Sequence, residues 1–93
     1  MIRVDGHTFW RGGDKIGFID GDHIKNHEGD KVGYVQGNYI YDIKGHKLAY
    51  MEADHICFLN SPHKIRIEDN DKEISGGDLS NIQKAAVRVL LGE

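Results

Sequence analysis

Apolar and polar residues follow a repeating pattern between residues 13 and 60. The segment contains three copies of a sixteen-residue repeat, each of which opens with a glycine and has a lysine two positions later. An aliphatic, a small, an aromatic and another apolar residue follow, and an isoleucine comes five positions further on. The copies are GDKIGFIDGDHIKNHE, GDKVGYVQGNYIYDIK and GHKLAYMEADHICFLN. Such self-similarity indicates a supersecondary unit that buries its apolar side against its neighbours.

Each repeat begins with a period of two, which is typical of a β-strand. In the first copy this alternation places Ile16 and Phe18 on one face of the strand and Gly17 on the other. The aromatic residue is Tyr34 in the second copy and Tyr50 in the third, and we expect these rings to meet in a common interior. The small residue at the Gly17 position indicates that another backbone or ring packs closely above it.

Dipeptides that favour tight turns divide each repeat into two short strands. These dipeptides are Asp20-Gly21, Gln36-Gly37 and Glu52-Ala53. Glycine reaches positive φ at little cost, and because the third copy has Ala53 instead, we expect no strict need for positive φ at this bend. Partial copies extend the repeats over about residues 2–69. The turns predict four hairpins, over residues 7–20, 22–36, 38–52 and 54–68.

The sequence therefore predicts one mainly β domain, residues 1–93, with a single C-terminal α-helix. The four hairpins can form a pseudo-four-fold, flower-like arrangement or a curled meander, and a barrel would also close the sheet edges. We expect a loop or a loose last strand over residues 70–77. An amphipathic helix is predicted over 78–91, since Ser80 and Gln83 have capping-box spacing. It is expected to pack on the open face of the hairpins, or on its twin in a partner subunit.

Composition and charge narrow the functions that we consider. Of the 93 residues, 39% are hydrophobic, which is modest for so small a core and favours a homo-oligomer. The net charge is −3 and the basic residues are spread along the repeats, so we do not expect nucleic-acid binding. With no apolar run of about 20 residues and no signal peptide, we expect a cytoplasmic protein without membrane contact, although a trimmed secreted chain also fits. The single cysteine, Cys57, excludes an intrachain disulfide and is expected to be a small buried side chain.

Aromatic residues on the second strands form the first candidate site. Trp10, Tyr39 and Tyr41 are expected on the face opposite the buried isoleucines, where rings can stack against a ligand or a partner. His23 and His55 share one position of the repeat and complete this candidate ligand-binding set. The alternative is that these rings only pack within the core or between sheets.

Carboxylates beside the tight turns form the second candidate, a cation site. Its proposed ligands are Asp20, Asp22, Glu52 and Asp54. If the linkers face a common axis, their oxygens would suit a hard cation such as Ca²⁺, whereas the alternative is that they favour bends by bonding their own backbone. Another repeat position has metal-ligand chemistry but is expected to hold solvated turn residues. Its members are Asp14, Asp30, His46 and His63.

The motif G-x-K-[IVL]-[GA]-[FY]-[IVM], followed by an isoleucine-centred strand, resembles the four-fold beta-flower proteins, small bacterial domains of uncharacterised function. The resemblance covers about residues 2–69, with Tyr39-Ile40-Tyr41-Asp42-x-x-Gly45 as its most recognisable piece, and Ala53 and Arg66 depart from it. It implies four hairpins as petals and a closing helix, without any activity or catalytic residue. The same piece resembles, less closely, the longer YD repeats of bacterial shell-forming toxins.

No nucleophile-elbow motif or phosphate-binding loop occurs in the sequence. We therefore expect a non-catalytic binding or assembly module that is oligomeric, needs no cofactor and recognises an unidentified protein or small molecule. The alternative is a small metal- or acid/base-dependent enzyme that would use His23, His55 and the linker carboxylates.

Overall fold

The computed structural model describes residues 2–77 and 79–91, except the side chains of residues 71, 73 and 75. Within these residues the chain forms ten strands and two helices. The strands are β1 (Ile2–Asp5), β2 (Thr8–Arg11), β3 (Asp14–Asp20), β4 (His23–Asn26), β5 (Lys31–Gln36), β6 (Tyr39–Asp42), β7 (Lys47–Glu52), β8 (His55–Phe58), β9 (Lys64–Arg66) and β10 (Ile74–Ser75). The helices are α1 (Ile67–Glu73) and α2 (Asn81–Leu90).

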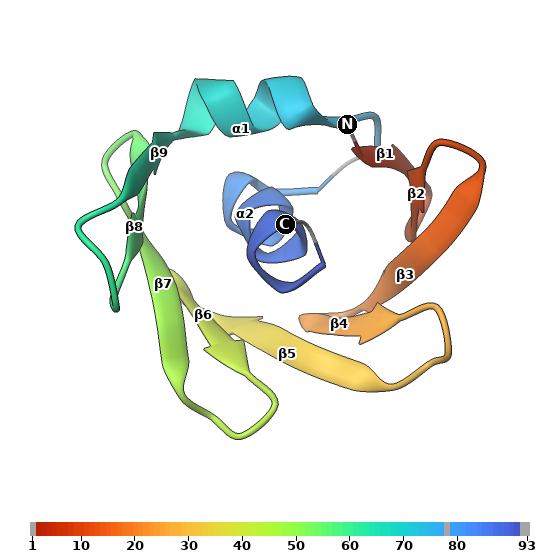
Figure 1. Cartoon of the computed structure of the whole chain (residues 1–93), viewed down its shortest axis with the longest axis horizontal. Coiled ribbons are helices and arrows are strands. Elements are labelled where there is room, and N and C mark those ends of the chain that lie inside the picture. Colours follow the sequence, from red (N-terminus) through yellow and green to blue (C-terminus); the bar gives the residue numbers. More distant parts are fainter. Residues whose placement is uncertain (1, 78, 92–93) are drawn as a thin grey trace.

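All ten strands belong to one sheet, which curls around α2 (Figure 1). From β1 to β9 each strand pairs antiparallel with the next strand of the chain, and β10 pairs in parallel with β1. α1 bridges the opening between β9 and the other end of the sheet (Figure 1). The predicted mainly β domain with a C-terminal helix is thus confirmed, and its hairpins form a curled meander.

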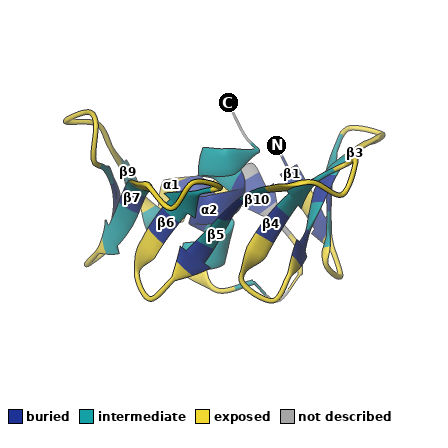
Figure 2. Ribbon diagram, turned by 90° about the horizontal axis from the view of Figure 1, so that it is seen from below, coloured by how far each residue is buried: buried dark blue, intermediate teal, exposed yellow. Residues whose placement is uncertain are grey.

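The inside of the curl is filled by aliphatic side chains from the strands and from α2, together with Phe9 of β2. The constant isoleucines of the repeat, Ile24, Ile40 and Ile56, are at most 1% exposed. The buried residues of α2 are Ala85, Ala86 and Val87. Figure 2 shows this burial on α2 and along the strands, with the connecting turns exposed. Since burying one isoleucine contributes about 1.5–3 kcal/mol, these contacts hold helix and sheet together.

α2 begins at the predicted capping box. The Ser80 Oγ accepts a hydrogen bond from the Gln83 backbone N–H (3.3 Å), and the Gln83 Oε1 accepts one from the Ser80 backbone N–H (2.9 Å). These two bonds satisfy amides that would otherwise lack partners at the first turn. The predicted packing of this helix on the hairpins is confirmed. Its predicted first residue, position 78, lies outside the described residues.

The predicted loop or loose last strand over residues 70–77 is wrong for residues 70–73, which belong to α1 (Ile67–Glu73), whereas the short strand β10 (Ile74–Ser75) follows as the second alternative allows. The segment is polar, but Ile67, Asn70 and Ile74 recur at helical spacing and turn inward. Acidic residues in the first turn and Lys72 in the last suit the helix dipole. The polar composition of this segment indicates a loop, whereas the spacing of Ile67, Asn70 and Ile74 indicates a helix.

The expected interior position of the aromatic rings is also wrong, because each first strand of the repeat contains a β-bulge. In β3, Gly17 pairs with Phe9 and Lys15 with Trp10, so Ile16 has no residue opposite it. The same register shift occurs where β5 and β7 pair with the preceding strands. Ile16 packs against the core next to buried Gly17, and the alternation resumes with Phe18 on the outer face. A bulge adds one residue to a strand and so reverses the faces that follow.

The small residue of the repeat allows α2 to approach the sheet closely, as predicted. A Cβ atom added at Gly17 would collide with the Lys25 carbonyl oxygen and lie 2.7 Å from the Leu91 Cδ1. At Gly33 it would collide with the Tyr41 carbonyl oxygen and lie 2.7 Å from the Leu90 Cδ1. Ring packing is therefore not the reason for these glycines, since a backbone oxygen and a helix leucine occupy the space.

We predict that Gly33→Ala lowers the free energy of unfolding by about 1–3 kcal/mol, because the new methyl group must displace backbone or α2. Gly13→Ala is the matched control, since no heavy atom lies within 4 Å of its added Cβ. Urea unfolding followed by circular dichroism measures both variants. Equal stability of the two variants would contradict the close approach of α2 at β5.

Positive φ recurs at the first position of the two-residue turns. The values are 63° at Gly6, 61° at Gly21, 62° at Gly37 and 53° at Ala53. The expectation that Ala53 relaxes this requirement is therefore wrong. The same two-residue connection joins β7 to β8 as joins β3 to β4, so the turn geometry imposes its φ on alanine.

We predict that Ala53→Gly raises the free energy of unfolding by about 0.5–1 kcal/mol, because glycine removes the Cβ penalty at positive φ but gains chain entropy when unfolded. Gly37→Ala tests the reverse change, and its added Cβ would meet nothing within 4 Å. Thermal and urea unfolding should show that Ala53→Gly is more stable than the wild type and that Gly37→Ala is less stable. A loss of stability in Ala53→Gly would argue against the strained turn.

Candidate functional site

Four tyrosines form a continuous cluster on the outer face of the sheet, which we call the tyrosine face. Tyr34 and Tyr41 stack in parallel, with ring centroids 4.8 Å apart and an interplanar angle of 7°. Tyr39 contacts Tyr41 at 6.4 Å and Tyr50 at 6.0 Å, in tilted geometry. His23 extends the cluster, with its ring 5.9 Å from that of Tyr34.

Strand register brings these rings together. Tyr34 on β5 lies opposite Tyr41 on β6, and Tyr39 on β6 lies opposite Tyr50 on β7. Ile40, between the two β6 tyrosines, is fully buried and points to α2, so its neighbours must point outward. Cross-strand aromatic pairs of this kind stabilise a sheet by roughly 0.2–1 kcal/mol each. Part of the cluster therefore has a structural role.

Cationic side chains lie over several outer rings. The Lys47 Nζ is 4.1 Å from the Tyr39 ring centroid. Lys15 and Lys25 both approach Phe18, at 5.2 Å and 5.5 Å. These contacts fit cation–π attraction, and they place positive charge beside aromatic surface.

The structure brings together only part of the predicted ligand-binding set. Tyr39, Tyr41 and His23 belong to one outer surface. Trp10 lies on β2, where the Arg3 guanidinium is 6.0 Å from its ring, and His55 on β8 pairs with Asp54 at 2.8 Å.

Tyr34 and Tyr50 were missed because the strict alternation assigned them to the interior. The phenol hydroxyl groups of Tyr34 and Tyr50 are a sequence signal that favours an outer position. A buried tyrosine needs a hydrogen-bond partner for its hydroxyl, whereas an outer position leaves the hydroxyl in water.

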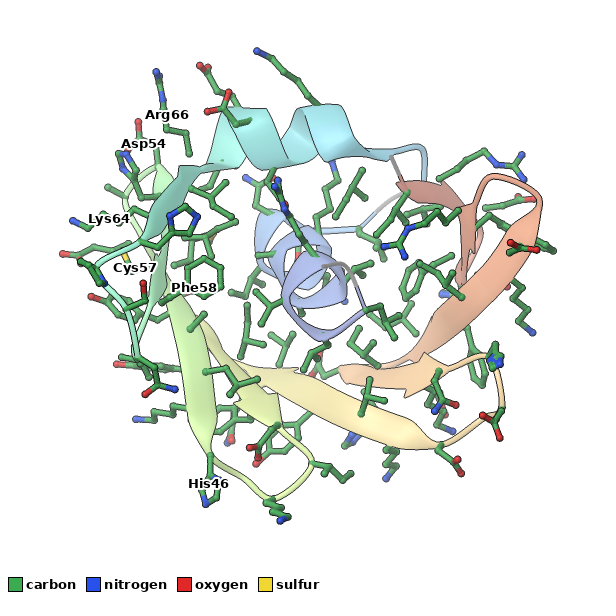
Figure 3. All side chains as sticks on the ribbon, viewed as in Figure 1. His46, Asp54, Cys57, Phe58, Lys64 and Arg66 are labelled. Carbon is green, nitrogen blue, oxygen red and sulfur yellow. The ribbon has the colours of Figure 1, made fainter. Side chains whose placement is uncertain are left out.

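Cys57 is buried, as predicted, but it lies on the outer side of β8. Figure 3 shows its sulfur pointing away from α2 and the neighbouring Phe58 pointing toward it. Cys57 pairs with Tyr50 across the strands. The charge that a Cys57 thiolate would carry raises the pKa of the Tyr50 phenol, with a hydrogen bond between the two side chains adding to it.

The predicted carboxylate ligands are distributed over separate turns. Asp20 lies 3.5 Å from the Lys25 Nζ, and Asp54 pairs with the adjacent His55. Across residues 2–77 and 79–91, no three histidine, cysteine, aspartate or glutamate side chains come close enough to hold a metal ion.

Two of the longer loops are organised by the side chain at the end of the preceding strand, Asn26 on β4 and Asp42 on β6. Asn26 Oδ1 accepts hydrogen bonds from the backbone N–H groups of Glu28 (2.9 Å) and Asp30 (3.0 Å). Asp42 repeats this arrangement with Lys44 (2.8 Å) and His46 (2.9 Å). The His46 backbone N–H, helped by that of Lys44 and by the nearby imidazole, lowers the pKa of the Asp42 carboxyl.

We predict that this carboxylate contributes stability that depends on pH. Since the folded pKa of Asp42 lies below the unfolded value of about 3.9, the contribution is complete above that value. It is lost as the pH falls through the folded pKa. Asp42→Asn is the matched control because Asn26 makes the same bonds without charge. Urea unfolding between pH 7 and pH 2 should show that the free energy of unfolding falls less on acidification in Asp42→Asn than in the wild type. An identical pH dependence of the two proteins would contradict a stabilising role of the Asp42 carboxylate.

A cavity of about 200 Å³ lies on the inner side of the sheet, between the last hairpin and α2. Its lining residues are Phe58, His63, Ile65, Arg88 and Val89. The His63 ring stacks on Phe58 with centroids 5.5 Å apart. Arg88, from α2, donates a hydrogen bond from Nη1 to the Asn70 Oδ1 on α1 at 3.4 Å.

Comparison with protein-family models, with curated proteins and with solved structures finds no match for this chain. In the part of the chain that the structure describes, neither helix has the length and apolar character needed to cross a membrane. The tyrosine face and the inner cavity are the two candidate functional sites of the molecule.

Proposed function

We propose that the protein is a non-catalytic assembly module that associates with a second copy of itself through the tyrosine face. The observation that carries the proposal is the set of four contacting tyrosines on the outer face of β5, β6 and β7. Tyrosines provide large contact area and a hydrogen-bonding hydroxyl at low cost in side-chain entropy, and they are enriched at protein interfaces. Tyr39 is 38% exposed, which is high for so large a ring.

The orientation of the rings favours a protein surface over a flat ligand. Tyr34 and Tyr41 stack on each other across the strands, and the Lys47 Nζ covers a face of Tyr39. Sugars and bases bind best to aromatic faces that are open. Both arrangements present ring edges rather than open faces to a partner, and edges suit interdigitation with the side chains of another protein.

Charge favours a second copy as the partner. Lys47 and Glu52 are the first and last residues of β7, and both are exposed on either side of Tyr50. A two-fold axis near Tyr50 would bring Lys47 of each copy against Glu52 of the other. Isologous interfaces need such self-complementarity, and oppositely charged rims also set the register of docking.

We predict that Lys47→Glu and Glu52→Lys each weaken self-association by about tenfold, because each change creates two like-charge contacts per dimer. The variant that carries both changes should recover association, since it restores both attractive pairs. An equimolar mixture of the two single variants should form heterodimers for the same reason. Sedimentation velocity over a range of concentrations measures all four samples.

Tyr39→Ala tests the ring contribution, and Trp10→Ala is its control because Trp10 is an outer ring on β2, which lies apart from the tyrosine face. Only Tyr39→Ala should weaken association. A wild-type chain that stays monomeric at millimolar concentration would overturn the proposal. Equal association of all charge variants would also do so.

A further inference from the structure

The cation Arg88 lines the inner cavity, and none of the carboxylates that the structure describes pairs with it. Arg88 is partly buried, and its described polar contact is the neutral Asn70 side chain at 3.4 Å. The neighbouring carboxylates that the structure describes on α1 are engaged elsewhere, Glu68 with Arg66 at 3.1 Å and Asp69 with Lys72 at 3.7 Å. No ion pair joins Arg88 to any described carboxylate.

This arrangement has an energetic cost. Removing a guanidinium from water is unfavourable unless an anion or several strong hydrogen-bond acceptors replace the lost hydration. A single long hydrogen bond, donated by Arg88 to the Asn70 Oδ1, replaces little of it. Asn70 is itself only 1% exposed, so it holds the guanidinium in position from a fixed site on α1.

The rest of the cavity is apolar. Phe58, Ile65 and Val89 line it, and His63 covers Phe58 at one side. α2 packs against β4 to β7 and against α1, and the cavity lies beside β8 and β9, where the helix and sheet are less tightly packed. Its volume of about 200 Å³ is below the range of drug-sized pockets, so only a small ligand fits.

We propose that this cavity binds a small organic monocarboxylate with an aromatic or branched aliphatic body. The guanidinium of Arg88 would receive the carboxylate, since its planar donors match two carboxylate oxygens. The apolar body would lie against Phe58, Ile65 and Val89. This site is on the inner side of the sheet and does not depend on self-association through the tyrosine face.

Titration of the full chain with benzoate, followed by NMR chemical shifts, tests the proposal, with benzamide as the neutral analogue of the same shape. Benzoate should bind in the micromolar to millimolar range and shift resonances of Phe58, Ile65 and Val89, and benzamide should bind at least about tenfold more weakly. Arg88→Gln should reduce benzoate affinity by a similar factor. Arg66→Gln should leave it unchanged, because Arg66 lies on β9 outside the lining and pairs with Glu68.

Asn70→Asp provides a second variant, because it places a carboxylate beside Arg88 and should compete with benzoate. Its folding is verified by circular dichroism. Failure of wild type to bind either benzoate or isovalerate at roughly 10 mM, above the expected range of dissociation constants, would overturn the proposal. Equal affinity for benzoate and benzamide, or undiminished binding by Arg88→Gln, would overturn it as well. Binding of acetate as tight as that of benzoate would contradict the apolar part of the site.

Discussion

The close approach of α2 to the sheet is the constraint on which the rest of the structure depends. Leu90 at the end of α2 and its C-cap Leu91 lie 2.7 Å from a Cβ built at Gly33 and Gly17, so the helix end packs directly on the glycine backbone of the sheet. The curled sheet holds α2 in its interior (Figure 1). α1 bridges the remaining opening, and the chain passes from the last hairpin to the central helix through it (Figure 1).

The β-bulge makes this packing compatible with an aromatic outer surface. It places Ile16 and Gly17 next to each other on the inner side and sends Phe18 outward. One repeat therefore supplies both a glycine beneath α2 and a ring on the solvent side. Where the second copy has Tyr39 and Tyr41 in place of the first copy's His23 and Lys25, the outer rings merge into a cluster.

The two candidate sites lie on opposite sides of the same sheet, and each arises where a copy of the repeat departs from the others. The tyrosine face forms around the second copy, the one richest in tyrosine. The cavity forms beside the last hairpin, where β8 and β9 pair without a register shift and α2 packs less tightly. Regular repeats build the scaffold, and its irregular positions carry the candidate recognition chemistry.

The sequence by itself determined the strands, the hairpins, the tight turns and the capped helix, because turn glycines, isoleucine spacing and the Ser80–Gln83 pair are local signals. Tertiary structure alone decided which face each ring occupies, since a bulge is a mismatch between two strands and is invisible within one. It also imposed positive φ on Ala53. The pairing of Arg88 with Asn70 could not be foreseen, because packing between two helices brings together residues that are 18 positions apart.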